Sequence, residues 1–471
     1  MSALRTMRVD WLLLINAIVG SFLAGLSTRI FLISLPTVAN GLGTDILGIS
    51  WALISFQLTS ISLSIVFGRL GDIYGRYKIY GLGFAIMTVS SFLCGISTNV
   101  LQLIGFRSLQ GIGSAMGAST ARVLAMDAMP EGSEGKANSF MTMSFHSGFF
   151  VGPPLGGFII DYINWRWTFF LLIPIGLIGI VLTALRSKTS RAAEAGHRET
   201  VDYVGASMLV VLTVMLTLLI DRRIAESVGV GQKGVLAFVF LVTLSAFLVH
   251  ESRVTSPVMD LSLFRIRMFV FSIVSLFIVS FSYSVLGLLM PFYLQEVLHL
   301  SPSFMGIIFL TSPLFTIGLA PASGHLTDRI GPSVPASIGV AMTCGAMLTG
   351  TLLRTDSHWL LPTVLLAFVG VGSGLFNAAN QTAAIGSVPR EHRGLATGTV
   401  HTVFGLGHLF GISLGGLLLT LMFQMYLADP EARPSPEQPV AFVAAMNATF
   451  MVCLGMSVIA LLASILRGAK R

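Results

Sequence analysis

Long apolar segments alternate with short polar connections along nearly the whole chain. About fourteen of the segments are long enough to cross the hydrocarbon core of a bilayer as helices, which takes roughly 20 residues each. A transmembrane β-barrel would need short segments of alternating polarity, which the sequence lacks. The predicted spans are residues 11–35, 47–68, 79–97, 100–126, 138–160, 166–186, 203–220, 234–250, 268–294, 303–324, 335–353, 359–385, 395–426 and 440–466.

Composition supports an all-α integral membrane protein. Of the 471 residues, 54% are hydrophobic and 10% are charged, whereas soluble proteins carry about 25% charged residues. The pI of about 9.6 does not indicate a nucleic-acid partner, because the basic residues cluster in short loops between the spans. The three cysteines lie inside apolar segments without metal-site spacing, so we expect packing roles and no metal. The N-terminal apolar run is too long for a cleaved signal peptide and is expected to form the first helix.

The distribution of basic residues predicts the orientation in the membrane. With the N-terminus inside, 19 of the 28 Lys and Arg residues fall in cytoplasmic segments and six in outer ones. This asymmetry predicts a multi-pass protein of the cytoplasmic (inner) membrane, with both termini in the cytoplasm and an even number of helices. The loop 221–233 is an exception, with three basic residues on the outer side. Three arginines remain inside predicted spans: Arg29, Arg107 and Arg122.

The two ends of the chain resemble each other. The stretch GRLGDIYG (68–75) matches GHLTDRIG (324–331) at an offset of 256, and a longer match follows at an offset of 259. The longer match pairs Gly111, Gly113, Ser114, Pro130, Gly135, Ala137, Gly148, Gly152, Gly156 and Gly157 with Gly370, Gly372, Ser373, Pro389, Gly394, Ala396, Gly407, Gly411, Gly415 and Gly416. We therefore expect a six-helix bundle at 1–190, a second at 266–471, and an inserted helix pair with linkers at 191–265. Parallel six-helix repeats indicate a secondary transporter with its site between the halves.

Four motifs resemble the major facilitator superfamily, and the helix number resembles its fourteen-helix drug:proton antiporter (multidrug efflux) branch. GRLGDIYGRYK (68–78) is similar to the family signature after helix 2, although Ile73 stands where a basic residue is common. RSLQG (107–111) is similar to the helix 4 motif. GFFVGPPLGG (148–157) is similar to the helix 5 motif associated with exporters, and WRWTFFLLIPIG (165–176) to the start of helix 6. The resemblance implies the major facilitator fold, but it does not specify the solute.

The resemblance also implies roles for two groups of residues. In the family the first motif latches the halves on the cytoplasmic side, and Asp127 at the end of helix 4 is positioned to pair with Arg76. The alternative is that these charges serve topology alone. The implied gate residues are Gly68, Asp72, Gly75, Arg76, Lys78 and Asp127, with Gly324, Asp328 and Gly331 in the second repeat.

The helix 5 motif carries small residues at a spacing that suits close helix contact. Glycines four residues apart share one face and let another helix approach, and prolines are expected to bend the helix. We interpret this surface as a rocking interface, with ordinary small-residue packing as the alternative. The residues are Gly148, Gly152, Pro153, Gly156 and Gly157.

Several polar residues inside spans are candidates for a substrate cavity. Arg107 lies within helix 4, where an ionisable group normally faces a cavity or a partner, with Gln110 nearly one turn away; snorkelling to the headgroups is the alternative. Asn377, Asn380 and Gln381 share a face of the matching helix, where they could bind a solute or join helices.

None of the 21 acidic residues lies in the middle third of a predicted span. Cation exporters of the resembling branch carry an acid in helix 1. Aligned on Leu35–Pro36, this chain has Ser27 at the acid position and Arg29 two residues later. Arg29 either faces the cavity or snorkels to the outer surface. A cavity with two arginines and no carboxylate is expected to favour anionic or neutral solutes over cations.

Proton coupling then needs another carrier, and histidine titrates near neutrality. The candidates are His146 in helix 5 and His401 and His408 in its repeat counterpart, together with Arg107 as a sensing residue. His401 and His408 share a face, and His146 maps to position 405 between them. A packed neutral histidine is the alternative in each case.

The sequence thus predicts a monomeric secondary transporter in a lipid bilayer, exporting amphipathic small molecules by alternating access. No cofactor is expected, and a proton gradient is the expected energy source. An organic-anion or metabolite transporter or exchanger, and a lipid or glycolipid flippase, remain open alternatives on the same fold. An enzyme is not expected, because no catalytic cluster, nucleotide motif or soluble domain is present.

Overall fold

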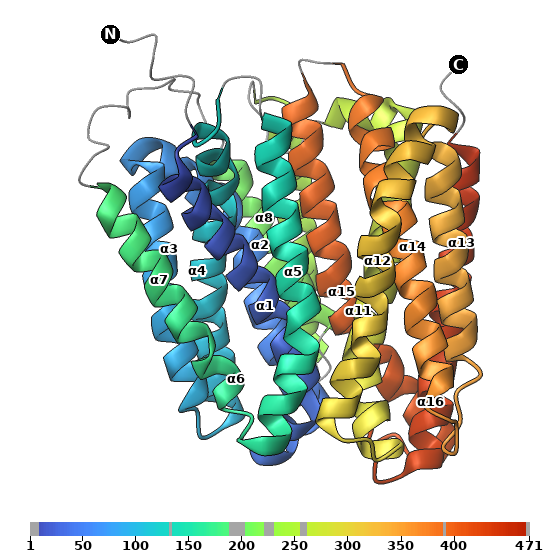
Figure 1. Ribbon diagram of the computed structural model, residues 1–471. Helices are drawn as coiled ribbons and strands as arrows, with labels where there is room; N and C mark the ends of the chain where they lie inside the picture. Colours follow the sequence, from blue (N-terminus) through green and yellow to red (C-terminus); the bar gives the residue numbers. More distant parts are fainter. Residues whose placement is uncertain are drawn as a thin grey trace, which may run out of the picture. The chain divides into compact units, whose positions relative to one another are not determined.

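The computed structural model describes residues 9–130, 134–187, 203–220, 230–254, 261–389 and 392–467. Within these ranges the chain forms helices and no strands (Figure 1). The first half contains α1 (Trp11–Gly41), α2 (Ile46–Tyr74), α3 (Arg76–Gly95), α4 (Val100–Asp127), α5 (Glu134–Tyr162), α6 (Trp167–Phe170) and α7 (Leu172–Ser187). The rest contains α8 (Tyr203–Ile220), α10 (Val230–Glu251), η1 (Leu261–Arg265), α11 (Arg267–Phe292), η2 (Tyr293–Val297), α12 (Pro302–Ile330), α13 (Ser333–Gly350), α14 (Leu360–Gly386), α15 (Arg393–Leu427) and α16 (Pro439–Leu466).

The predicted all-α membrane fold is confirmed, since each of the fourteen predicted spans corresponds to a helix. Eleven of the described helices are long and apolar enough to cross a membrane. Helix boundaries differ by up to six residues, and two of the differences are informative. Helix α1 continues through Pro36 to Gly41, six residues beyond the predicted end, because a proline late in a helix loses only one hydrogen bond. The sixth span is divided at Leu171 into the short α6 and the longer α7.

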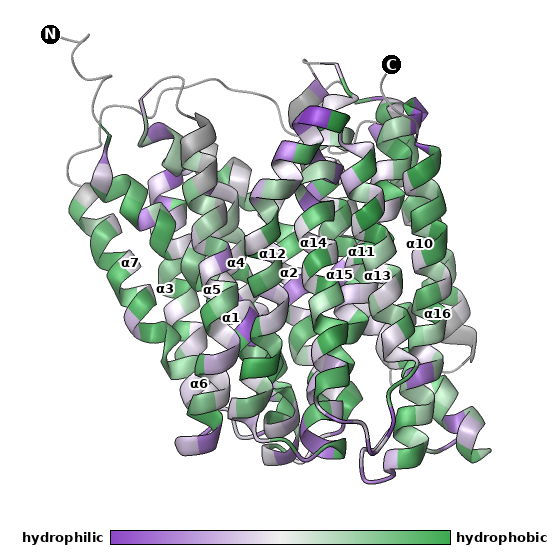
Figure 2. Cartoon of the chain, turned by 45° about the vertical axis from the view of Figure 1, so that its right-hand side comes forward, coloured by the Kyte–Doolittle hydropathy of each residue, from purple (hydrophilic) through white to green (hydrophobic). Residues whose placement is uncertain are grey.

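Hydrophobic residues predominate along the length of the helices, and hydrophilic residues are most frequent at helix ends and in the connections (Figure 2). Large apolar residues such as Phe92, Val181 and Leu462 are about half exposed, as expected of surfaces that face lipid rather than water. Cys94 and Cys453 are buried and unpaired, in agreement with packing roles.

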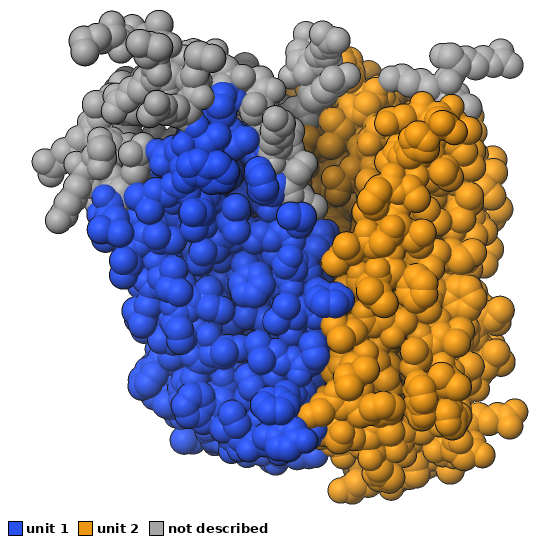
Figure 3. All heavy atoms as spheres, in the orientation of Figure 1, with its two compact units in different colours: residues 1–44, 51–201 blue, residues 45–50, 202–471 orange. Residues whose placement is uncertain are grey.

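The chain divides into two compact units, residues 1–44 with 51–201 and residues 45–50 with 202–471 (Figure 3). Helices α8 and α10, the predicted inserted pair, fall in the second unit, where they pack on each other and α8 also contacts α15. The predicted limits at 190 and 265 stay a prediction.

The internal repeat is visible in the helix contacts of each unit. A Cβ placed on Gly83 of α3 would lie 3.1 Å from the carbonyl oxygen of Gly113 on α4. At the matching crossing of the second unit, a Cβ on Gly339 would lie 2.7 Å from the carbonyl oxygen of Gly372. The offsets are 256 and 259, as in the sequence match. The same helix pairs therefore cross at the same glycines in both units.

The signature turn also recurs as a backbone conformation. Gly75 after α2 has φ of 100° and Gly331 after α12 has φ of 82°. Side chains rarely adopt this region, whereas glycine does so at little cost. The same kind of sharp turn thus follows α2 and α12, and each turn requires a glycine.

Candidate functional site

Helices α1 and α5 cross in close contact at the glycines of α5. A Cβ on Gly148 would lie 2.6 Å from the backbone nitrogen of Leu26 and still nearer the Phe22 carbonyl oxygen. Further along α5, a Cβ on Gly152 would lie 3.0 Å from the Arg29 Cβ. The face predicted from the four-residue spacing therefore packs directly on α1. Gly156 continues this face against Ile30, and α5 runs unbroken through Pro153, with Gly157 buried.

Arg29 lies on this crossing, beside Gly152 of α5. Its guanidinium carbon is 4.4 Å from the ring centroid of Phe149, a residue near the middle of α5. Helix α1 continues twelve residues beyond Arg29, about 18 Å at 1.5 Å per residue. The side chain thus packs across α5 instead of extending toward the end of α1, and this geometry disfavours the snorkelling alternative.

Arg107 is buried in the first unit, with 1% of its surface exposed. Its guanidinium carbon lies over two aromatic rings, 4.2 Å from the centroid of Phe31 and 4.5 Å from that of Phe56. Its Nε donates to the Ala52 carbonyl oxygen at 3.3 Å. No carboxylate forms an ion pair with Arg29 or Arg107 in the described part of the chain. Two cations are therefore held among aromatic rings, where cation–π attraction partly offsets the loss of water.

Gln110 connects Arg107 to a third helix. Arg107 donates to the Gln110 Oε1 at 2.6 Å, and Gln110 Nε2 donates to the Ser91 hydroxyl at 2.8 Å. The chain of bonds thus links α2, α4 and α3, and Gln110 is fully buried. Ser27, at the position where relatives carry an acid, is also buried, and its hydroxyl makes no hydrogen bond to any described residue.

The three amides of α14 are not brought together as one polar surface. Asn380 is buried and bonds the Ser272 carbonyl oxygen at 3.1 Å, whereas Asn377 is half-buried and Gln381 is exposed. Arg467, at the end of α16, donates to the Asn380 Oδ1 at 2.9 Å. Asn380 therefore serves as a joint between helices of the second unit.

Arg467 is one of the 19 basic residues predicted to lie in cytoplasmic segments, and it is buried. It is 3% exposed, and its Nε donates to the Ser464 carbonyl oxygen at 2.8 Å. It also donates to the Ser272 hydroxyl on α11. Ser464, one turn before Arg467, and Ser272 on α11 could have indicated this burial, because a solvated arginine does not need such acceptors.

We expect Arg467→Met to destabilise the second unit by roughly 2 kcal/mol. The substitution leaves the buried Asn380 Oδ1 without its donor, and an unmade buried hydrogen bond costs about 1–3 kcal/mol. Thermal unfolding of the purified protein in detergent measures the change. Arg267→Met is the control, because Arg267 makes one exposed hydrogen bond, to the Leu466 carbonyl oxygen. Equal destabilisation by both variants would contradict the inference that Arg467 joins the helices of the second unit.

The three candidate histidines occupy different environments. His146 on α5 is half-buried, with its ring centroid 6.2 Å from that of Phe149. His401 is exposed on α15. His408 is half-buried, and its Nδ1 is hydrogen-bonded to the Ser284 hydroxyl on α11. The His408 side chain is thus bonded to another helix of the second unit.

The gate motif contains the expected ion pair. Arg76 Nη1 and Asp127 Oδ2 are 3.8 Å apart, with about half of each side chain exposed, so the pair contributes only about 0–1 kcal/mol. Lys78 and Asp328 are exposed, and the Asp72 side chain lies outside the described side chains. A Cβ on Gly68 would lie 3.6 Å from Ser119, whereas open space surrounds Gly324.

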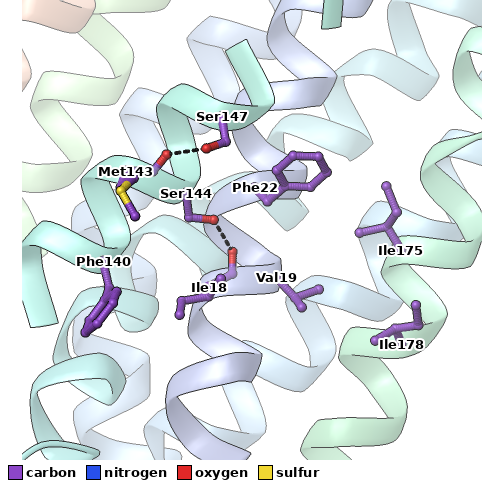
Figure 4. Close-up of a pocket in the computed structure, with 9 residues that line it drawn as sticks. All are labelled: Ile18, Val19, Phe22, Phe140, Met143, Ser144, Ser147, Ile175 and Ile178. Atoms are coloured by element: carbon purple, nitrogen blue, oxygen red, sulfur yellow. Dashed lines mark hydrogen bonds between the residues drawn. The ribbon is translucent and has the colours of Figure 1, made fainter. Parts of the chain in front are cut away.

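A groove of about 380 Å³ lies in the first unit between α1, α5 and α7 (Figure 4). Its two serine hydroxyls are used internally: Ser144 donates to the Ile18 carbonyl oxygen at 2.7 Å and Ser147 to that of Met143 at 2.8 Å. The groove therefore offers an apolar surface without anchors for a polar solute. The remaining lining residues are Val19, Phe22, Phe140, Ile175 and Ile178.

Comparison with known proteins agrees with this architecture. The sequence profile of the Major Facilitator Superfamily matches residues 17–276 and 272–470. The chain belongs to the Major Facilitator Superfamily. A solved structure of a peptide transporter in complex with sulfate is similar in fold, with a TM-score of 0.70 at 16% identity. The match covers 97% of this chain and 95% of the peptide transporter chain.

Curated relatives are transporters rather than enzymes. The riboflavin transporter RibZ of Clostridioides difficile is 26% identical over 459 residues, which are 98% of each chain. The multidrug transporter protein MdtP of Bacillus subtilis is 26% identical over 439 residues, 93% of this chain and 81% of the relative. This major facilitator protein is accordingly a multi-pass membrane transporter of a small molecule, and the resemblance to the multidrug efflux branch is confirmed.

Proposed function

We propose that this transporter exports amphipathic anionic or neutral small molecules by alternating access, driven by proton influx across the cytoplasmic membrane. One observation carries the solute preference. The first unit holds the guanidinium groups of Arg29 and Arg107 among aromatic rings, with no carboxylate paired to either in the described residues. A fixed positive field of this kind repels cations and attracts anions or electron-rich aromatic rings.

Alternating access is supported by the repeated glycine-lined crossings. In the first unit Gly156 packs against Ile30, and in the second Gly415 packs against Val285. Smooth contacts without interlocking side chains allow one helix to shift against another. Major facilitator transporters move in this way because parallel repeats rock around a fixed site.

Two alternatives remain on the same fold. The riboflavin relative favours a neutral heteroaromatic metabolite as the solute, which is compatible with the cation and aromatic residues around Arg29. A lipid or glycolipid flippase would use an apolar lateral path, and the groove of Figure 4 is apolar. The groove lacks a polar anchor for a headgroup, so the export of a dissolved solute is the stronger proposal.

The test is transport by the purified full chain in liposomes, with naphthalene sulfonate, riboflavin and ethidium as anionic, neutral and cationic probes. Arg29→Met is expected to reduce sulfonate transport at least tenfold, the effect of about 1.4 kcal/mol, and riboflavin transport much less. Arg122→Met is the control, because Arg122 is an exposed arginine of α4. Efficient ethidium transport by the wild type, or equal losses for both arginine variants, would contradict the proposal.

A further inference from the structure

The groove of the first unit lies between two helices that diverge. Helix α1 packs against both α5 and α7, whereas α5 and α7 make little contact with each other among the described residues. In Figure 4 α1 accordingly lies between them, and its residues Ile18, Val19 and Phe22 form the floor of the groove. Contact with α5 is made instead by α6, next to the C-terminal end of α5. The groove therefore lies toward the N-terminal end of α5.

The second unit closes the equivalent place with its own helices. A Cβ on Gly81 of α3 would lie 2.8 Å from Thr183 on α7, and Ser337, 256 residues after Gly81, is bonded to Ser464 on α16 at 2.8 Å. Thr183 and Ser464 are 281 residues apart, so this offset relates α7 to α16 as 259 relates α5 to α15. Helices α15 and α16 pack directly against each other. The opening between the corresponding helices of the first unit is thus not a property of the repeat.

Side chains at equivalent positions show the same difference. Ser144 and Ile175 line the groove. Their counterparts at the two offsets are Val403 and Met456, which pack in the apolar core of the second unit. The Ser144 hydroxyl is small and donates to the Ile18 carbonyl oxygen of α1 at 2.7 Å. The first unit thus supplies less apolar side-chain volume between its fifth and sixth helices.

The surface of this groove suits a hydrocarbon. Both of its serine hydroxyls are bonded within the protein, and the remaining described lining residues are apolar. At its rim Met143 is 65% exposed and Ile178 is 52% exposed, so the groove is continuous with the surface that faces lipid. Water does not reach the hydrocarbon region of a bilayer, and a polar solute would leave its own hydrogen bonds unmade there. Lipid tails are the molecules that remain.

The volume of the groove corresponds to one fatty acyl chain. An apolar cavity of about 150 Å³ holds one benzene molecule, with its six carbon atoms. The groove measures about 380 Å³, which on the same scale suits about 15 carbon atoms. A single acyl chain of a membrane phospholipid has roughly this size, whereas a whole phospholipid with two chains and a headgroup is much larger.

The depth of the groove matches the reach of a lipid tail from one leaflet. Its lining on α5 begins at Phe140 and ends at Ser147, six to 13 residues after Glu134, which is about 9–20 Å along the helix. On α7, Ile178 lies nine residues before Ser187, about 14 Å from the same end. The hydrocarbon core is about 30 Å thick, so each leaflet contributes about 15 Å. The middle and end of a tail therefore lie at the level of the groove while its headgroup stays at the surface.

We propose that this groove binds one acyl chain of a membrane phospholipid, from the leaflet at the N-terminal end of α5. With the orientation predicted from the basic residues, this is the cytoplasmic leaflet. The chain completes the packing of the first unit, as direct contact of α15 and α16 completes that of the second. Because lipid tails are as apolar as leucine, shape and contact hold the chain rather than the hydrophobic effect. The bound lipid is separate from the solute that the protein transports.

The experiment uses the full-length protein in liposomes that contain phosphatidylglycerol with a photoactivatable diazirine at the end of one acyl chain. After illumination, mass spectrometry of peptides measures the label on residues 18–22, the floor of the groove, and on α10, which exposes Phe238 and Leu248. The floor side chains are half-buried, so passing lipids label them weakly, whereas a bound chain should label them at least as strongly as α10. A diazirine beside the carboxyl group of the chain should label the floor less, because that part stays near the surface.

A variant that fills the groove tests the site itself. Ser147→Phe should lower the label on residues 18–22 at least about threefold, since a chain then touches protein on one side rather than three. Ser245→Phe on α10 is the matched control and should leave this label unchanged. Each serine hydroxyl donates at 2.8 Å to the carbonyl oxygen four residues earlier, Ser147 to Met143 and Ser245 to Leu241. Ile178→Trp fills the groove from α7 and replaces Ser147→Phe if the latter does not fold.

Thermal unfolding in detergent gives a second measurement. Added phosphatidylglycerol should raise the unfolding temperature of the wild type and of Ser245→Phe more than that of Ser147→Phe. An equal rise in all three, or a floor label that persists in the groove-filling variants, would overturn the proposal. Loss of the label on addition of excess riboflavin or naphthalene sulfonate would overturn it in favour of a solute site, and cross-links between two copies at Met143 in place of lipid label would overturn it in favour of a dimer contact.

Discussion

Replacing Gly148 with alanine is expected to reduce transport to below about one hundredth of the wild-type rate. The added methyl group would meet the backbone of α1 at Phe22 and Leu26, and a backbone cannot rotate away as a side chain can. Overpacking of this kind costs about 1–3 kcal/mol or more, and 3 kcal/mol corresponds to roughly two factors of ten. Transport of riboflavin and naphthalene sulfonate in liposomes, with thermal unfolding in detergent, measures the two consequences.

Two further variants make this prediction specific. Gly105→Ala adds the same methyl group to α4 where nothing lies within 4 Å, and it should leave transport unchanged. Gly407→Ala places the group 2.7 Å from the Phe277 carbonyl oxygen, at the equivalent crossing of the second unit, and should be as harmful as Gly148→Ala. Normal transport by Gly148→Ala would show that α1 and α5 separate easily and would contradict the close-packed crossing.

The fold was largely predictable from the sequence because lipid imposes a simple rule on the chain. Every backbone group within the hydrocarbon must be bonded internally, so each long apolar run had to become a helix. The repeat was predictable for a related reason, since glycine is retained where two helices touch. Gly113 and Gly372 matched in sequence and then met equivalent glycines in the structure.

The polar residues were less predictable, because their roles depend on neighbours far away in the chain. Asn380 was expected either to bind a solute or to join helices, and its bond to Arg467, 87 residues later, could not be read from the sequence. Arg29 left two alternatives open in the sequence, and its contact with Phe149 on another helix could not be read from its own helix. Burial beside a partner cannot be read from periodicity when both faces of a helix are apolar.

The roles of the histidines also depend on neighbours far away in the chain. Their positions on α5 and α15 were identified by spacing alone, which could not distinguish among them. The bond from Ser284 to His408 separates one histidine from the others, and it does so through the repeat that the sequence had already indicated. Sequence symmetry and structural contact together thus locate a difference between the two halves.

Arg107→Lys is expected to reduce transport at least tenfold, although the charge is retained. The guanidinium carbon lies 4.2 Å from the ring centroid of Phe31 and 4.5 Å from that of Phe56, and the group also donates to Gln110. An ammonium group is a compact, strongly hydrated point charge that cannot stack between two rings in this way. Desolvated cation–π contacts contribute about 2 kcal/mol each, so losing part of two such contacts should also lower the free energy of unfolding by roughly 2 kcal/mol.

The same variants separate charge from shape. Arg107→Met keeps much of the side-chain volume without the charge, and it should transport no better than Arg107→Lys if the planar stack is what matters. Arg122→Lys changes an exposed arginine on the same helix and should have little effect. Liposome transport and detergent unfolding measure all three. Full activity in Arg107→Lys with none in Arg107→Met would assign the role to charge alone, and the stacked guanidinium would then be incidental to the transport cycle.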